Sequence, residues 1–445
     1  MQTRTEIIAS EFCSSVRDGT HDSPKEVLSG GKPLVTTKHL KGGNIDFDNT
    51  YNISEEDFEK INKRSKVDKW DVLISMIGTV GEVYLVDKEP DYAIKNLGLF
   101  KVGDEINSKW LYFYLKSKIG QNQIRFLLQG STQQYISLKS LRGFPLFVPN
   151  DDKEKEIVVN FLSALESKIK TNQRMNETLE EIAKTLFKSW FIDFDPVRAK
   201  AEGRSTGLSK EISDLFPDSF EDSELGEIPK GWEINKLGHH INLTKGKSYK
   251  SAELKESDTA LVTLKSFQRN GGYREDGLKE YTGSYKDEQI VSDGDLIVAF
   301  TDVTQAADVI GKPAIVIGNP NYSKLVISLD VGVVRVVSES MLTNAFIYFL
   351  MLSNRYASNS LGYTNGTNVL HLKKEAITEY DFCLPNNHSL LKIYNDISKN
   401  MLEKISKNSL ENITLEKLRD TLLPKLISGE LKIPDAEEII EESGI

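Results

Sequence analysis

One helical phrase occurs twice in this chain. NETLEEIAKTLFKS spans residues 176–189, and NITLEKLRDTLLPK spans residues 412–425, so the second copy follows at an offset of 236. An internal repeat over so long an interval indicates a duplicated structural unit. With 445 residues the chain is also too long for a single hydrophobic core, so two or three domains are expected.

The repeat extends far upstream of the helical phrase. At the same offset Gly130 matches Gly366, and an offset of 227 pairs Gly19 with Gly246. The chain therefore reads as a globular part, a helix and a linker, followed by a second globular part and a second helix. The predicted segments are a globular domain at 1–150, a long helix at 151–195, a linker at 196–232, a globular domain at 233–386, a long helix at 387–431 and an acidic tail at 432–445.

Each globular part is predicted to be α+β. Stretches 108–129 and 342–358 have the composition of helices that pack on a sheet. Short β-branched or aromatic runs broken by Gly and Pro predict strands. These strands are expected at 34–37, 72–77, 82–86 and 144–148.

The two long helices carry a heptad seam, which is typical of a coiled coil. Two asparagines interrupt each seam, Asn172 and Asn176 in the first helix and Asn408 and Asn412 in the second. Two unrelated amphipathic helices would have no reason to hold polar residues at matching positions. If a pseudo-twofold axis relates the copies, the helices run antiparallel and each a position faces a d position. Asn172 should then pair with Asn412, and Asn176 with Asn408.

The sequence contains no recognisable catalytic site. GNPNY at 318–322 lacks the second proline of an adenine-methyltransferase loop and is more typical of a turn. GKS at 246–248 lacks the first glycine of a phosphate loop, because Ile241 stands there. His239 and His240 have no ligand partners at usable spacing, so no metal site is expected.

Charge and hydropathy restrict the class of protein. A net charge of −10 argues against nonspecific coating of nucleic acid, although 56 Lys and Arg residues leave room for a local basic groove. The strongest apolar run, 342–352, is too short to span a membrane, and a cytoplasmic protein is expected. Cys13 and Cys383 lie in unrelated contexts and are interpreted as buried thiols.

Five phrases distributed over nearly the whole chain resemble the DNA specificity (S) subunit of type I restriction-modification systems. They are DGTHDSP at 18–24, GSTQQYISLKSL at 130–141, LFKSWFIDFDPVRAKAEG at 186–203, GEIPKGWEINKLG at 226–238 and LRDTLLPKLISGEL at 418–431. The resemblance implies two target-recognition domains separated by paired helices, and no chemistry in this chain. It also implies double-stranded DNA, two methyltransferase (M) subunits and motor-nuclease (R) subunits as partners. S-adenosylmethionine, ATP and Mg are then expected on the partners. One departure is that the first half lacks a counterpart of the GWE entry segment.

Base-edge readout requires amide, hydroxyl and guanidinium side chains on loops, with Lys and Arg nearby to grip phosphate. Polar loops repeated in both halves fit this need, although an ordinary polar turn is the alternative for each. Because these loops diverge most between the halves, the predicted target is bipartite and asymmetric. The candidate DNA-binding residues are Thr36, Lys38, Lys41, Thr79, Ser131, Thr132, Gln133, Gln134, Thr263, Lys265, Arg269, Thr301, Asn365, Thr367 and Asn368.

Apolar residues at the helix ends exceed what a two-helix seam can bury, and exposed apolar patches usually mark interfaces. The candidate partner-binding residues are Trp190, Phe191, Phe194, Leu423 and Leu426. Two rival functions stay open, namely an active methyltransferase or restriction enzyme with a duplicated recognition region, and a coiled-coil scaffold without a nucleic-acid role.

The seam asparagines are expected to fix the helix register. A helix of about 38 residues is roughly 57 Å long, which could hold two modules at a fixed separation. A slip of one heptad would displace one helix by about 10 Å, or about three base pairs. Register should therefore determine the half-site spacing that the protein accepts.

Overall fold

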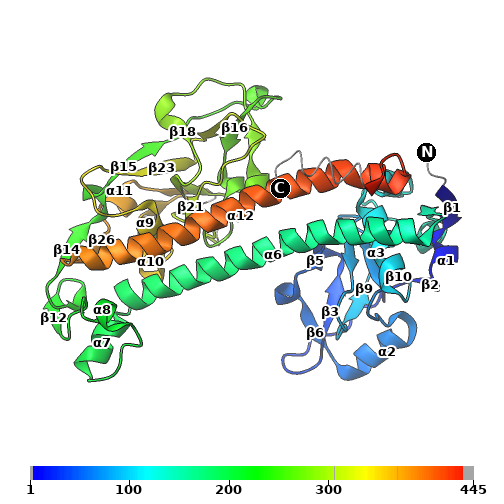
Figure 1. The fold of residues 1–445 in the computed structure, drawn as a ribbon, viewed down its shortest axis with the longest axis horizontal. Helices are drawn as coiled ribbons and strands as arrows, with labels where there is room; N and C mark the ends of the chain where they lie inside the picture. The colour runs from blue at the N-terminus through cyan, green and yellow to red at the C-terminus, as the bar shows by residue number, and fades with distance from the viewer. Residues whose placement is uncertain (1–3, 305, 368, 434–445) are drawn as a thin grey trace. The chain divides into compact units, whose positions relative to one another are not determined.

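The computed structural model describes residues 4–304, 306–367 and 369–433 (Figure 1). It divides into two compact units, which are joined by the long helices α6 (Asp152–Phe191) and α12 (His388–Ser428). Unit 1 comprises residues 4–169 and 414–433, and unit 2 comprises residues 170–413. Each unit contains a β-rich part and a portion of both long helices, so the predicted α+β class is confirmed.

Unit 1 contains a four-stranded antiparallel sheet, a three-stranded sheet with one parallel pair, and two short antiparallel pairs. Helices α1 (Ala9–Phe12), α2 (Glu55–Ser65), α3 (Glu105–Lys116), α4 (Lys118–Phe126) and α5 (Leu138–Arg142) accompany them. In spatial order the strands are β2 (Ser15–Asp18), β10 (Leu97–Lys101), β7 (Val72–Ser75) and β8 (Val83–Leu85); β6 (Tyr51–Ile53), β3 (Lys32–Thr36) and β9 (Ala93–Lys95); β1 (Arg4–Ile8) and β11 (Pro145–Pro149); and β4 (Leu40–Lys41) and β5 (Asn44–Ile45).

Unit 2 repeats this topology with additions. Helices α9 (Asn344–Met351), α10 (Asn354–Gly362) and α11 (Glu375–Thr378) correspond to α3, α4 and α5. Its strands in spatial order are β15 (Ile241–Lys245), β23 (Val331–Val336), β19 (Leu296–Ala299) and β21 (Pro313–Ile315); β17 (Lys279–Glu280), β16 (Thr259–Val262), β22 (Lys324–Ile327) and β18 (Ile290–Val291); β14 (Trp232–Lys236) and β26 (Asp381–Pro385); and β20 (Thr301–Asp302), β25 (Leu370–Leu372) and β24 (Thr364–Asn365).

Two predictions about the repeat need correction. The first half does have an entry strand, because β1 pairs with β11 over five residues just as β14 pairs with β26. The predicted helices at 108–129 and 342–358 are each two helices, since a serine ends one and caps the next. Ser117 accepts a hydrogen bond from the Gly120 N–H, and Ser353, at the matching position, accepts one from the Tyr356 N–H.

Segment 196–232, predicted as a linker, is folded onto unit 2. It contains α7 (Asp195–Ala201), α8 (Lys210–Ser213) and the hairpin of β12 (Phe220–Ser223) and β13 (Gly226–Pro229). Val197, Phe216 and Ile228 are buried in the core of unit 2. The apolar side chains spaced through this polar segment explain why it does not remain an open connection.

This packing overturns the predicted exposure of the partner-binding residues. Trp190, Phe191 and Phe194 are at most 8% exposed, because Phe216 and Trp232 cover them with ring centroids 5.3 to 5.9 Å away. The other two candidates, Leu423 and Leu426, are buried in the core of unit 1. The chain's own β-rich parts therefore bury these side chains, and they present no apolar patch to a partner.

The long helices pack against each other within each unit. In unit 1, Leu165 and Ile169 of α6 contact Leu415 of α12, while Val158 and Leu422 share the main core. In unit 2, α6 residues near 190 lie against Tyr394. As the residue number rises along α6 from Leu165 to Trp190, that of the contacting residue in α12 falls from Leu415 to Tyr394, so the predicted antiparallel direction is confirmed.

The predicted asparagine pairing is also confirmed. The Asn172 Nδ2 donates to Asn412 Oδ1 at 3.0 Å, and the Asn408 Nδ2 donates to Asn176 Oδ1 at 2.8 Å. Asn172, Asn408 and Asn412 are buried, with side chains in the helix seam. Each pair has a further partner, because Asn172 also donates to Glu411 and Asn176 to Ser409. Their amides are therefore well satisfied in this one alignment of the helices.

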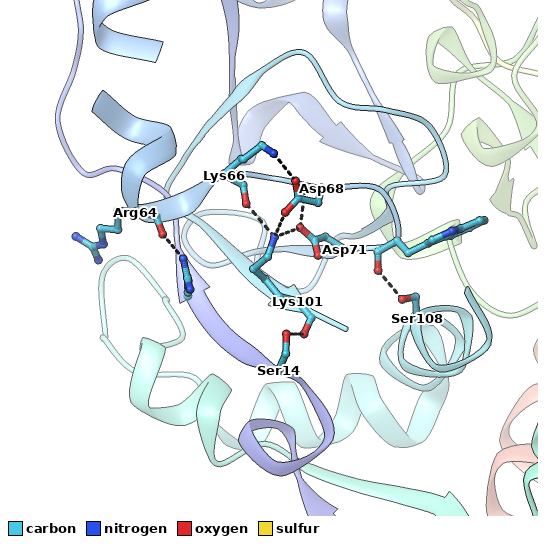
Figure 2. A network of polar contacts seen from close by, with 9 residues as sticks. Ser14, Arg64, Lys66, Asp68, Asp71, Lys101 and Ser108 are labelled. Carbon is cyan, nitrogen blue, oxygen red and sulfur yellow. Dashed lines mark hydrogen bonds and ion pairs between the residues drawn. The ribbon is translucent and has the colours of Figure 1, made fainter. Parts of the chain in front are cut away.

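A polar network connects segment 66–71 to strand β10 in unit 1 (Figure 2). The Lys101 Nζ of β10 lies 2.7 Å from a carboxylate oxygen of Asp68 and of Asp71, and it also donates to the Lys66 carbonyl. Burial raises the pKa of the Asp71 carboxyl, although Lys101 opposes this effect. The network therefore holds segment 66–71 to the sheet and serves a structural role.

Candidate nucleic-acid interface

Three loops meet in the β-rich part of unit 1. They are the β4–β5 turn at 41–44, the loop after β7 at 77–82, and a hairpin at 129–135 whose end residues exchange backbone hydrogen bonds of 2.8 and 2.9 Å. The Gly42 N–H donates to Glu82 at 3.0 Å, and Ile77 forms an antiparallel bridge with Tyr135. We call these three segments the three-loop end of unit 1.

The same three loops meet in unit 2, at 267–273, 302–310 and 364–371. The Asn270 N–H donates to the Asp308 carbonyl at 2.8 Å, and β20 pairs with β25 through Thr301 and His371. His371 lies 236 positions after Tyr135, so the paired hairpin is the repeated one. We call these segments, in their described residues, the three-loop end of unit 2.

A glycine shapes the hairpin in both units. Gly130 and Gly366 have φ of +88° and +115°, in the region that L side chains rarely adopt. A Cβ on Gly130 would lie 2.4 Å from the Gln133 carbonyl oxygen, and one on Gly366 would lie 2.0 Å from that of Val369. The repeated glycine is thus required by the turn itself.

Replacing Gly366 with alanine should disrupt the hairpin of unit 2. Positive φ costs a residue with a Cβ about 1–2 kcal/mol, and the clash with Val369 adds to this. On the DNA-reading role that the resemblance implies, we expect the affinity for a DNA target to fall at least about tenfold, measured in complex with the methyltransferase subunits that the resemblance implies. Gly362→Ala is the matched control, because a Cβ at Gly362 meets nothing within 4 Å. Equal binding by the two variants would contradict the role of the hairpin.

Most of the predicted DNA-reading side chains are exposed. Those at the three-loop ends are Lys41, Thr79, Ser131, Thr132, Gln133, Gln134, Arg269, Asn365 and Thr367. Lys38 and Lys265 are also exposed, but they lie in short 3-10 turns outside these loops. Asn368 lies outside the described residues. The structure therefore gathers most of the candidates into one loop cluster per unit.

Two threonine candidates are buried, which corrects their assignment as base contacts. Thr263 is 5% exposed, and its hydroxyl accepts from the Lys265 N–H at the start of a turn. Thr301 is 7% exposed and donates to the Asp330 carboxylate at 2.9 Å. Thr36 is half-buried, and its N–H donates to His39 at a matching turn. These residues shape the backbone next to the loops.

Two of the candidate threonines, Thr79 and Thr301, do not occupy equivalent places in the two units. Ile77 bridges Tyr135, and Thr301 pairs with His371 at the matching position, so Thr301 corresponds to Ile77. Thr79 lies in the exposed loop that follows.

A buried carboxylate organises the longer loop of unit 2. Asp302 is fully buried and accepts hydrogen bonds from the N–H groups of Thr304 and Val309, both at 2.8 Å, and of Ile310 at 3.3 Å. Burial would raise the pKa of Asp302, but these hydrogen bonds outweigh burial and hold it below its ordinary value. Ala307 adopts φ of +55° within this loop. The hydrogen bonds to the Asp302 carboxylate therefore fix the conformation of the loop.

Basic side chains flank the three-loop ends. Lys41 lies 3.3 Å from Asp46, and Arg269, which is 83% exposed, lies 3.6 Å from Asp308. Exposed ion pairs of this kind contribute little to stability and leave the cations accessible to phosphate. Sequence reasoning missed Lys373 and Lys374, which are exposed directly after β25. Their position beside the glycine hairpin could have identified them.

The motifs considered for catalysis have structural roles. The 318–322 segment forms a turn in which the Tyr322 N–H donates to the Asn319 carbonyl.

Burial raises the pKa of the Cys13 and Cys383 thiols to about 12 and about 11, so both stay protonated at neutral pH. Within the described residues, no cluster of three or more His, Cys, Asp or Glu side chains could hold a metal ion. A search of the described helices finds none with the length and hydropathy of a membrane span.

The chain thus consists of two related β-rich units that each present polar loops and are joined by paired helices. Residues 10–181 match the family described as the type I restriction modification DNA specificity domain. The HindI specificity subunit of Haemophilus influenzae is 31% identical over 158 residues, which cover 34% of each chain. The MjaIX specificity subunit of Methanocaldococcus jannaschii is 25% identical over 434 residues, which cover 92% of each chain.

A crystal structure of a type I S subunit from M. genitalium has the same fold. It aligns with a TM-score of 0.54 over 96% of both chains, at 15% sequence identity. The chain belongs to the type I restriction-modification specificity (S) subunits. It is thus a DNA specificity subunit, a non-catalytic component of the type I enzyme.

Proposed function

We propose that each unit reads one half of a bipartite, asymmetric DNA sequence with its three-loop end. The observation that carries this proposal is the recurrence of one loop arrangement with different side chains. The hairpin of unit 1 presents Gln133 and Gln134, whereas that of unit 2 presents Asn365 and Thr367. Amide side chains suit bidentate contacts to adenine, and hydroxyls serve several bases, so the two halves should differ in sequence.

The partners are proposed on the basis of the family. We infer that two methyltransferase subunits and motor-nuclease subunits assemble on this chain, and that S-adenosylmethionine, ATP and Mg bind to those partners. Trp190 and Leu426, proposed earlier as docking residues, are buried in their own units. Docking must therefore use other side chains of the assembled molecule.

Exchange of one unit's recognition part tests the proposal. The chain is purified with its methyltransferase partners, and the adenines methylated in duplex DNA are mapped before and after residues 1–150 are replaced by the equivalent region of a relative. One half-site should change, while the other half-site and the spacer stay as they were.

Three outcomes would contradict this reading. A swap that altered both half-sites would refute modular recognition. Methylation by this chain without partners would indicate an enzyme. Absence of any sequence preference with the partners present would favour a scaffold without a role in DNA recognition.

A further inference from the structure

Two exposed valines lie at the open end of the β20–β25 ladder in unit 2. Asp302 pairs with Leu370 in the antiparallel register, so Val303 and Val369 are the next residues along the two strands. Their exposed fractions are 69% and 39%. Each lies in a different loop of the three-loop end of unit 2, and the ladder brings these loops together.

The matching place in unit 1 is not apolar. There Ile77 bridges Tyr135 as Thr301 pairs with His371, so the residues that match Val303 and Val369 are Thr79 and Gln133. Both are exposed. The two units thus share the strand pairing at this place, but two apolar side chains in unit 2 stand where unit 1 has a hydroxyl and an amide. This is the pattern expected where the halves recognise different chemical groups.

The surroundings of the valines are basic and polar. Arg269 projects from the loop that bonds to the 302–310 segment, and Lys373 follows β25. Asp302, directly before Val303, fixes the course of that loop through the Thr304 and Val309 N–H groups. The two valines thus form a small apolar surface with basic side chains nearby. Such a surface can contact a small apolar group that belongs to a polyanion.

One base presents such a group in the major groove. The 5-methyl of thymine is the apolar group that distinguishes its edge, and apolar side chains contact it. We propose that Val303 and Val369 contact the 5-methyl group of a thymine in the half-site read by unit 2. This inference rests on the proposed function, and it assigns the chemistry of one base in that half-site.

Replacement of thymine by deoxyuridine tests the inference, because it removes the methyl and keeps base pairing. The probe is a duplex carrying the mapped target, bound by the chain with its methyltransferase partners. Deoxyuridine is placed at one thymine at a time. We expect affinity to fall about fourfold at one position in the unit 2 half-site, the effect of one buried methyl. Replacement of Val303 and Val369 should not change the effect of deoxyuridine at any thymine of the unit 1 half-site.

A double variant assigns the effect to the valines. In Val303→Ala, Val369→Ala the ratio of affinities for thymine and deoxyuridine should fall towards one. The control is Leu28→Ala, which trims a fully exposed apolar side chain outside the three-loop ends. It should leave the ratio at about four.

The inference is overturned if the unit 2 half-site contains no thymine, if no deoxyuridine position in it lowers affinity, or if the double variant keeps the full ratio. The proposed function fails differently. In that case exchange of the recognition part of a unit leaves both half-sites unchanged, or the complex shows no sequence preference for any duplex.

Discussion

Replacement of all four seam asparagines, Asn172, Asn176, Asn408 and Asn412, by leucine should leave the protein as stable as the parent or more stable, and should loosen its discrimination of spacer length. The amides pair across the seam in unit 2 at 2.8 and 3.0 Å. Replacing both partners of a buried polar pair by apolar groups is often neutral or stabilising. What the replacement removes is the penalty on other alignments, in which an amide would face leucine.

Single substitutions should behave in the opposite way. Asn172→Leu deprives Asn412 of its amide partner in the buried seam, which should cost about 1–3 kcal/mol. We expect a lowered midpoint of thermal unfolding for the single variant and an unchanged or raised midpoint for the quadruple variant. That contrast would show that the loss in the single variant comes from the broken amide pair and not from the change to an apolar side chain. Spacer discrimination is measured as methylation of duplexes whose half-sites are moved apart by one to four base pairs. Unchanged discrimination in the quadruple variant would show that the asparagines do not set the register.

The helices and their pairing could be predicted because their signals are periodic and local. A heptad seam with polar residues at matching positions specifies both direction and alignment, and the observed partners of Asn172 and Asn408 follow from it. The glycine hairpins were found for a similar reason. A turn that requires positive φ leaves a glycine at Gly130 and Gly366, and duplication makes it visible.

The errors arose where the fold depends on contacts distant in sequence. Trp190 and Phe191 were expected to be exposed because the helix seam cannot bury them, but Phe216 and Trp232 return from later segments to cover them. Likewise, the three-loop ends depend on bridges such as Ile77 with Tyr135, which no local pattern marks. Asp302 gave no signal in the sequence, since a single aspartate after a strand is common in loops.

Asp302 should be the most sensitive position for recognition by unit 2, and Asp302→Ala should abolish discrimination of that half-site while the other half-site is still read. Its carboxylate satisfies the N–H groups of Thr304, Val309 and Ile310. Leaving a buried N–H without an acceptor costs about 1–3 kcal/mol, so loss of three acceptor contacts exceeds what a short loop can offset. The loop would open, and water would replace the carboxylate.

Hydrogen exchange reports this opening without DNA. The amides of Val309 and Ile310 should exchange at least tenfold faster in Asp302→Ala than in the parent chain. Asp308→Asn is the matched control, because that carboxylate lies in the same loop and forms an ion pair at 3.6 Å with the exposed Arg269, a contact that contributes little to stability. Slow exchange in both variants, with the unit 2 half-site still discriminated, would contradict the role of Asp302.

The protonation of Asp302 gives the same test a pH dependence. Its folded-state pKa lies below the ordinary value for an aspartate, so its contribution to stability is fully present above the unfolded pKa of about 4. The contribution is lost only as the pH falls through the lower, folded-state pKa. Protection of Val309 and Ile310 in the parent chain should therefore be constant between about pH 5 and 8 once intrinsic exchange rates are corrected, and should decline only in stronger acid. A loss of protection already at pH 6 would mean that another group frames the loop.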